Sequence, residues 1–293
     1  MVNKKGIILK GVGGFYYVKT DSEVFECKAR GIFRKDSLKP FVGDIVEISP
    51  ISATQAIIEK IKQRKNYLIR PPISNVDQLI IVSSIANPVF NTVFIDKLIS
   101  IACFNNIEPI LVISKVDLED PSELLKIYKS AEIKTIVTSK DDKNSHEAIK
   151  KLLPSKVTVF TGNSGVGKST LLNFIDKRLT LETGLISQKL KRGKHTTRHV
   201  ELYPIENGFV ADTPGFSNID LQKFNIITRE DLEYSLKEFR PFLGECKFNS
   251  CNHIGEKGCF IIKAIEEGKI NPSRYSSYLS MYNEIKNIEE WKR

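Results

Sequence analysis

Residues 157–175 read VTVFTGNSGVGKSTLLNFI, an apolar run, a glycine-rich loop and a second apolar-rich run in direct succession. The loop at 162–169 matches the pattern GxxxxGKS, and it stands after a strand pattern and before a helical pattern, the context in which such a loop cradles phosphates. Glycines let consecutive backbone N–H groups turn inward, and the N-terminus of the following helix adds partial positive charge. The stretch therefore predicts a nucleotide-binding P-loop on an α/β sheet rather than an ordinary glycine-rich turn.

Two side chains of this loop have expected roles. Lys168 is expected to meet the β- and γ-phosphates and to assist catalysis, and the Ser169 hydroxyl is expected to be a ligand of Mg²⁺ bound with the nucleotide. Nucleotide contacts are predicted for the whole loop and the start of the helix, namely Gly162, Asn163, Ser164, Gly165, Val166, Gly167, Lys168, Ser169 and Thr170.

Two downstream segments suit the γ-phosphate and the metal ion. The tetrapeptide DTPG ends the apolar run GFVAD, so Asp212 is expected to hold the Mg²⁺ shell and the Gly215 N–H to detect the γ-phosphate. Between this segment and the P-loop lies QKLKRGKHTTRH at 188–199, which carries five Lys/Arg and no acid. We predict Thr197 as a third magnesium ligand, with Thr196 as the alternative; a solvated basic loop without a ligand role is the other interpretation.

Candidate base-recognition residues precede the P-loop in the chain. An aspartate after the strand PILVI can accept two N–H bonds from the guanine edge, and the lysine stem two residues before it can pack on the base plane. Backbone N–H groups after the next strand can bind the guanine carbonyl. A KxD tripeptide after a strand is often unremarkable, but the two segments share a position at strand ends. The predicted residues are Ser114, Lys115, Val116, Asp117, Thr138, Ser139 and Lys140.

A Cys3His set lies near the C-terminus, spaced Cys-x4-Cys-x-His-x5-Cys within fourteen residues. Three thiolates and one imidazole in a compact arrangement suit one structural, tetrahedral zinc ion per chain, with no ligand position left for water. Three unrelated thiols are the alternative. The other two cysteines, Cys27 and Cys103, stand in apolar strand and helix patterns and are expected in the core. The predicted ligands are Cys246, Cys251, His253 and Cys259.

Composition and apolar periodicity divide the chain into three parts. Of its 293 residues 41% are hydrophobic and 27% charged, and the net charge of +9 is concentrated in residues 1–66, with 13 Lys/Arg against 7 Asp/Glu, as expected of a nucleic-acid-binding surface or merely of a basic one. Short alternating runs from 6 to 61 predict an all-β, OB-like barrel. No run is long enough to span a membrane and no signal peptide is apparent, so a cytoplasmic protein is expected.

The alternation of strands and helices predicts the central and C-terminal folds. After Pro71 and Pro72, strand patterns alternate with helical patterns up to the P-loop, which favours a parallel, doubly wound sheet for 67–220. Beyond Gly215 the alternation stops, and an α-helical zinc-binding domain is expected at 221–293. The predicted strands are 78–84, 109–114, 135–138 and 157–160, and the predicted helices are 93–104, 122–130, 146–152, 230–239 and 275–290.

These motifs together resemble the ribosome small-subunit-dependent GTPase family, over nearly the whole chain. The matching segments are SKVD at 114–117, GNSGVGKST at 162–170, KHTTR at 194–198, DTPG at 212–215 and the Cys3His set. The resemblance implies an OB-fold RNA-binding domain at 1–66, a circularly permuted P-loop GTPase domain at 67–220 and a zinc domain at 221–293. It further implies GTP or GDP as ligand, the small ribosomal subunit and its rRNA as partners, and hydrolysis stimulated by that subunit during late maturation; a monomer is the default expectation.

Two positions depart from the patterns of related enzymes. Ser114 stands where the family pattern usually has asparagine, whose amide contacts the base and braces the P-loop, so guanine affinity is the property affected. Phe216 stands where Ras-like enzymes have a water-orienting glutamine, and it can neither donate nor accept a hydrogen bond. His195 in the basic loop is the predicted catalytic replacement, with an RNA-phosphate contact as its alternative role.

Two other functions compete with that of a GTPase. One is a nucleotide-locked RNA-binding module with negligible turnover, and the other is a P-loop ATPase.

Overall fold

The computed structural model describes residues 2–30, 39–69, 71–179, 200–212, 221 and 227–289. Residues 287–289 are described by their backbone only. The chain forms two compact units, each assembled from three separated segments. The first unit comprises Met1–Gln78, Glu147–Thr161 and Ser169–Pro214, and the second comprises Leu79–His146, Gly162–Lys168 and Gly215–Arg293.

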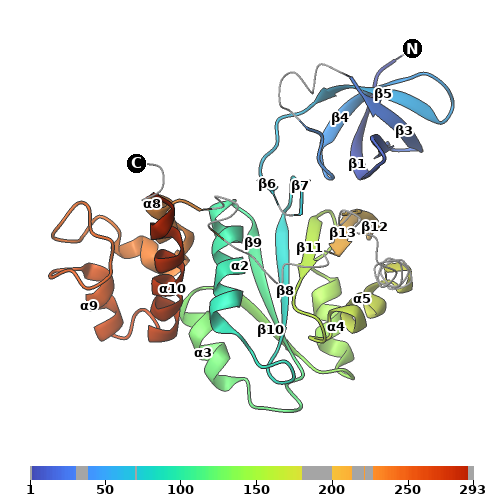
Figure 1. The fold of residues 1–293 in the computed structure, drawn as a ribbon. Helices are drawn as coiled ribbons and strands as arrows, with labels where there is room; N and C mark the ends of the chain where they lie inside the picture. The colour runs from blue at the N-terminus through green and yellow to red at the C-terminus, as the bar shows by residue number, and fades with distance from the viewer. Residues whose placement is uncertain are drawn as a thin grey trace. The chain divides into compact units, whose positions relative to one another are not determined.

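Five strands of the first unit close into a small barrel in the order β1-β2-β3-β5-β4 (Figure 1). The strands are β1 (Lys4–Val12), β2 (Phe15–Lys19), β3 (Val24–Ala29), β4 (Ile45–Pro50) and β5 (Gln55–Ile61). Alternate side chains point inward, as the alternating apolar pattern requires. The inward set is Ile8, Val18, Phe25, Cys27, Val46, Ile48, Ala56 and Ile58. The predicted barrel is therefore confirmed, and Cys27 is one of its core residues.

A buried carboxylate attaches the connector that follows β5, residues 62–74, to this barrel. Asp44 is completely buried and accepts a two-pronged ion pair from Arg64, with Nε–Oδ1 at 2.7 Å and Nη2–Oδ2 at 2.8 Å. The hydroxyl of Ser74 donates to the same carboxylate at 2.6 Å. Ser74 ends the short hairpin of β6 (Tyr67–Leu68) and β7 (Ile73–Ser74), so one carboxylate holds both sides of the connector.

The remaining strands form a six-stranded sheet in the order β10-β9-β8-β11-β13-β12. Its strands are β8 (Gln78–Ser84), β9 (Glu108–Ser114), β10 (Lys134–Thr138), β11 (Val157–Thr161), β12 (Tyr203–Ile205) and β13 (Gly208–Asp212). The pairs β9/β10 and β11/β13 are parallel, as predicted, whereas the edge strand β12 is antiparallel. Its three residues include a proline, which gave no strand signal in the sequence.

Helices follow the strands at nearly the predicted positions. They are α2 (Thr92–Phe104), α3 (Ser122–Ser130), α4 (Lys143–Lys150) and α5 (Lys168–Ile175). Helix α4 begins three residues earlier than expected because the Asp142 carboxylate accepts hydrogen bonds from the Asn144 and Ser145 backbone N–H groups and thereby caps its start. None of the helices in the described ranges is both long and apolar enough to cross a membrane.

The C-terminal segment is helical but more broken than predicted. The expected continuous helix at 230–239 is wrong: the chain forms α8 (Arg229–Leu232) and two 3-10 turns, Glu233–Ser235 and Lys237–Phe242. The break lies at Leu236, whose extended backbone (ψ 113°) separates the two turns. Helix α9 (Phe260–Glu266) was not anticipated, and α10 (Pro272–Glu289) confirms the helix predicted at 275–290.

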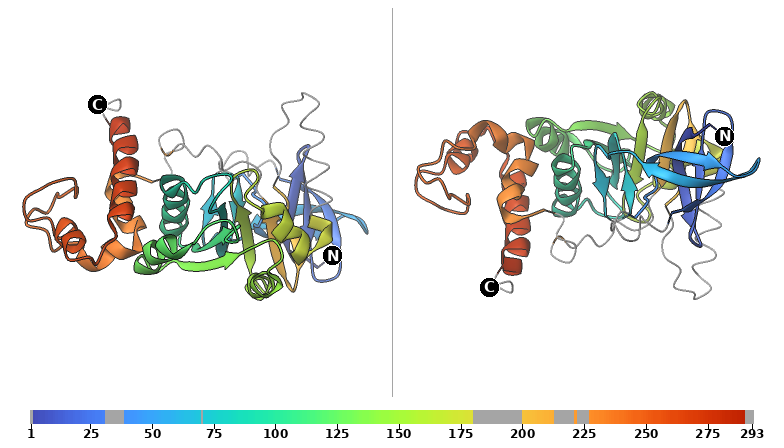
Figure 2. Two further views of the ribbon diagram at one scale, coloured as in Figure 1. Left: turned by 90° about the horizontal axis from the view of Figure 1, so that it is seen from below. Right: turned by 90° about the horizontal axis from the view of Figure 1, so that it is seen from above.

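A buried ionic cluster joins α10 to α2, which lies beside it in the second unit (Figure 2). Arg274 is completely buried; its Nε donates to Glu238 Oε1 at 2.6 Å and its Nη1 to Asp96 Oδ1. Tyr128 also donates to Asp96 Oδ1, at 3.1 Å. Burial raises the pKa of Asp96, although the positive charge of Arg274 opposes the rise. Two acids and one base thus share a site without access to water.

Candidate functional site

The predicted P-loop connects β11 to α5 and adopts conformations that need glycine. Gly162, Gly165 and Gly167 have φ values of 153°, 80° and 92°. A Cβ on Gly162 would lie only 2.2 Å from the Val82 carbonyl oxygen of β8, so no other residue fits there without moving the sheet. The loop is thus packed against the end of β8, and three of its glycines take positive φ values that other residues rarely adopt.

The structure brings the segment 114–117 to this loop. Ser114 ends β9 with 6% of its surface exposed, and its Oγ donates to the Val166 carbonyl oxygen at 2.5 Å. Lys115 takes the left-handed conformation (φ 61°), and its Nζ donates to the Asn87 carbonyl oxygen. Asp117 is exposed two residues further on. The chain turn therefore leaves a carboxylate accessible beside a strand end that touches the P-loop.

The segment 138–140 lies next to 114–117. The Val116 N–H donates to the Thr138 carbonyl oxygen at 3.4 Å, extending the parallel pairing of β9 and β10 beyond their ends. Thr138 is buried and its hydroxyl accepts from Ser145 at 2.7 Å, which fixes the strand end to α4. Ser139 is half-buried and Lys140 exposed. The segments 114–117 and 138–140, which were predicted separately as base-recognition segments, are therefore neighbours.

The predicted magnesium ligands are only partly described. Ser169 and Thr170 are exposed in the first turn of α5. Asp212 ends β13 and is paired in register with Phe160 of β11, two residues before the P-loop begins. His195, Thr196, Thr197 and Gly215 lie outside the described residues.

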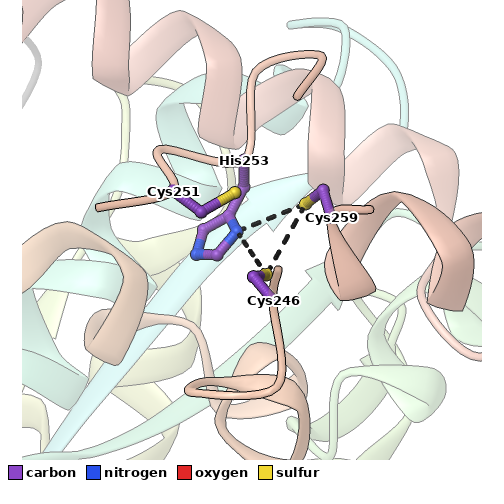
Figure 3. A group of neighbouring side chains, drawn as sticks. All are labelled: Cys246, Cys251, His253 and Cys259. Atoms are coloured by element: carbon purple, nitrogen blue, oxygen red, sulfur yellow. Dashed lines mark hydrogen bonds between the residues drawn. The ribbon is translucent and has the colours of Figure 1, made fainter. Parts of the chain in front are cut away.

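The four predicted metal ligands lie together in the second unit (Figure 3). Their ligand atoms are all within 4.8 Å of one another. His253 Nδ1 is 3.3 Å from Cys259 Sγ and 3.6 Å from Cys246 Sγ, and those two sulfurs are 4.0 Å apart. Donors bound at about 2.0–2.3 Å to one tetrahedral ion must lie at roughly such separations. The donor set therefore fits one metal ion.

Neighbouring side chains orient this cluster in a way that the sequence did not indicate. Glu233 Oε2 lies 2.7 Å from His253 Nε2, so the ring turns Nδ1 towards the sulfurs. From α10, the hydroxyl of Tyr275 donates to the His253 carbonyl oxygen at 2.9 Å. Glu233 is twenty residues from the histidine in a segment with no metal motif, so only the folded chain reveals it. Burial raises the pKa of the Cys251 thiol to about 12, and a bound cation would counter that cost by stabilising the thiolate.

Comparisons with known proteins agree with these observations. The sequence profile of the RsgA GTPase family matches residues 61–222, and that of the RsgA N-terminal domain matches residues 5–58. The small ribosomal subunit biogenesis GTPase RsgA of Clostridium botulinum (strain 657 / Type Ba4) is 46% identical, over 98% of this chain and 99% of the relative. Its counterpart from Caldanaerobacter subterraneus subsp. tengcongensis is 43% identical over 98% and 97%.

Solved structures show the same arrangement. The crystal structure of YloQ, a circularly permuted GTPase, matches with a TM-score of 0.80 and 36% identity over 98% of this chain and 96% of that one. YjeQ from Thermotoga maritima matches with a TM-score of 0.80 and 34% identity over 97% and 99%. The family and the fold class expected from the motifs are thus confirmed. This chain belongs to the RsgA GTPase family and is a circularly permuted P-loop GTPase that hydrolyses GTP.

Proposed function

We propose that this GTPase acts on the small ribosomal subunit during its late maturation and that the subunit stimulates its hydrolysis of GTP. The observation that carries the proposal is the full-length similarity to relatives named as small ribosomal subunit biogenesis GTPases, which spans the barrel, the sheet and the Cys3His cluster alike. The proposed domains are the barrel at 1–66, the GTPase domain at 67–220 and the metal-binding domain at 221–293. A cytoplasmic monomer is the simplest form consistent with this role.

The proposed guanine site consists of the two neighbouring strand ends. Asp117 accepts hydrogen bonds from the base, and the backbone of residues 138–140 donates to its carbonyl group. The exposure of Asp117 and the hydrogen bond from the Val116 N–H to the Thr138 carbonyl oxygen support this assignment, because the two segments follow neighbouring strands, β9 and β10.

The proposed phosphate site is the P-loop together with α5. Backbone N–H groups of the loop and Lys168 bind the β- and γ-phosphates and stabilise the charge that develops on them during hydrolysis. Magnesium ligands are proposed to be Ser169, Asp212 and Thr197, and Gly215 is proposed to sense the γ-phosphate. His195 is proposed to orient the attacking water, since an imidazole can both donate and accept a hydrogen bond.

The Cys3His cluster is proposed to hold one structural zinc ion. Its four ligands leave no position for a substrate, which supports a structural rather than a catalytic role. Zinc bound there would fix α10 through Tyr275 and hold the C-terminal segment in one conformation.

The barrel is proposed to contact rRNA. Lysine ammonium groups lie over aromatic rings on β1–β3, with Lys28 Nζ 5.2 Å from the Phe15 ring centre and Lys10 Nζ 5.3 Å from that of Tyr17. Paired cations and half-buried rings suit both phosphates and unstacked bases.

A turnover assay with purified ribosomal subunits tests the proposal. GTP hydrolysis is measured with the protein alone, with small subunits and with large subunits, and Lys168→Ala serves as the inactive control. We expect stimulation by small subunits only, and no comparable hydrolysis of ATP. Equal turnover in all three reactions would refute the stimulation. Nucleotide-dependent co-sedimentation without turnover would instead indicate an RNA-binding module locked by nucleotide.

A further inference from the structure

Ser114, at the end of β9, contacts both the P-loop and the end of β8. Its Oγ lies 2.5 Å from the carbonyl oxygen of Val166 in the P-loop and 3.3 Å from that of Ser83 in β8. Its own carbonyl oxygen accepts from the Ile85 N–H at 3.0 Å. Side chain and backbone therefore connect the end of β9 to both the end of β8 and the P-loop.

The hydroxyl has no second hydrogen to offer. A serine hydroxyl carries one hydrogen and two lone pairs, and a carbonyl oxygen can only accept. The much shorter distance identifies Val166 as the acceptor of that hydrogen. Because Ser114 is 6% exposed, its side chain is held in this position rather than free to turn towards a ligand.

The contact also determines the space beside the loop. Gly167 follows Val166 with φ 92°, and a Cβ on it would lie 3.7 Å from Ser114 Oγ. The Val166 side chain is itself buried, with 1% exposed. The serine therefore packs against the P-loop backbone at the point where the loop turns towards Lys168.

We propose that Ser114 positions the P-loop and donates no hydrogen bond to guanine, so that this protein does not read the imidazole edge of the base through β9. The inference rests on the proposed assignment of 114–117 to the base. Guanine offers the acceptors N7 and O6 on that edge. A hydroxyl whose only hydrogen is committed to Val166 cannot donate to either of them. From this segment, recognition then depends on the Asp117 carboxylate, which accepts from the opposite, N–H-bearing edge.

An asparagine at the same position would behave differently. Its amide has two N–H donors, so one can bind the Val166 carbonyl oxygen while the other remains for the base. Serine retains the contact with the loop and gives up the contact with the base. The two functions can thus be separated by substitution and by a modified nucleotide.

Binding of 7-deaza-GDP, in which C–H replaces N7, provides the measurement. Affinities for GDP, 7-deaza-GDP and ADP are compared by calorimetry in the full-length protein. The unmodified protein is expected to bind GDP and 7-deaza-GDP equally, within about twofold. Ser114→Asn is expected to bind GDP about two- to tenfold more tightly than the unmodified protein does, a gain that corresponds to one neutral hydrogen bond. With 7-deaza-GDP this gain in affinity should be absent. A preference of the unmodified protein for GDP above about threefold, or an equal gain for both nucleotides in Ser114→Asn, would overturn the inference.

Two further variants separate positioning from recognition. Ser114→Ala leaves the Val166 carbonyl oxygen without its side-chain donor, so affinities for all three nucleotides should fall by about fivefold or more and by the same factor. Ser130→Ala is the matched control, because its exposed hydroxyl donates to a helix carbonyl oxygen at 2.7 Å far along α3. An effect of Ser114→Ala no larger than that of the control would remove the positioning role.

Asp117→Ala distinguishes a failure of this inference from a failure of the proposed site. This substitution should weaken the binding of GDP about ten- to a hundredfold, because the base loses a charged acceptor. The affinity for ADP should stay nearly unchanged. If the affinities for GDP and ADP fall equally, residues 114–117 do not recognise the base, and the site assignment fails together with the inference. If only GDP loses while the unmodified protein discriminates against 7-deaza-GDP, the site stands and the role given to Ser114 is wrong.

Discussion

Replacing Arg274 with methionine should destabilise the second unit strongly. The substitution keeps most of the side-chain volume but removes the guanidinium that is ion-paired with both Asp96 and Glu238, which are buried. Breaking a buried ion pair by removing one partner costs about 3–5 kcal/mol, since an unpaired charge stays in the interior. For a unit of about 150 residues that corresponds to a fall in Tm of roughly 6–20 °C.

The cost in Arg274→Met should depend on pH. Burial already raises the pKa of Asp96 above its ordinary value, and loss of the guanidinium removes the main opposing charge. An acid with a raised folded-state pKa contributes stability at low pH that is lost as pH rises through that pKa. The difference in Tm between variant and parent should therefore shrink as pH falls towards about 4, near the unfolded-state pKa of an aspartate.

Calorimetric unfolding of the metal-loaded protein provides the assay, with two comparison variants. Lys126→Met removes an exposed ion pair to Glu123 and should change stability by no more than about 0.5 kcal/mol. Asp96→Asn and Glu238→Gln added to Arg274→Met should restore part of the loss, because neutral amides cost less to bury than unpaired carboxylates. A loss in Arg274→Met no larger than that in Lys126→Met would refute the reasoning.

Three further predictions concern the metal and the basic loop at 188–199. Cys251→Ser should abolish stoichiometric zinc, measured by metal analysis, and destabilise 221–293 while nucleotide affinity stays near that of the parent; full zinc content in this variant would contradict the assigned ligand set. Glu233→Ala should weaken zinc about ten- to a hundredfold in a chelator competition, because His253 loses the partner of Nε2. His195→Ala should remove most subunit-stimulated turnover and leave GTP affinity and subunit binding largely intact; if stimulated turnover survives, the histidine is not catalytic.

Local patterns in the sequence were sufficient for most of the architecture. The barrel strands and β8 to β11 follow from alternating or continuous apolar runs bounded by turn residues, and a P-loop between a strand and a helix is recognisable because glycine spacing and context coincide. The cysteine spacing likewise predicted a compact cluster, and its ligand atoms do lie together.

Features that depend on contacts between distant segments could not be predicted. No pattern near Arg274 in the sequence predicts its contact with Asp96, 178 residues away. In the same way, no pattern near Glu233 predicts its contact with His253. The helix expected at 230–239 failed because a helical apolar period does not reveal an extended residue such as Leu236, which tertiary packing places between two turns. The sequence shows that serine replaces the usual asparagine at position 114. Only the short contact to Val166 shows that the hydroxyl binds the P-loop rather than remaining available for the base.

The ionic junction between α2 and α10 has a consequence for exchanging parts among relatives. An apolar seam tolerates sliding by a helical turn, whereas a guanidinium fork between two fixed carboxylates accepts one register. A C-terminal segment transplanted from another member would thus keep its docking only if the recipient supplies an acid at position 96. The segment is remote from α2 in sequence, but in the folded chain its Arg274 is paired with a residue 178 positions earlier.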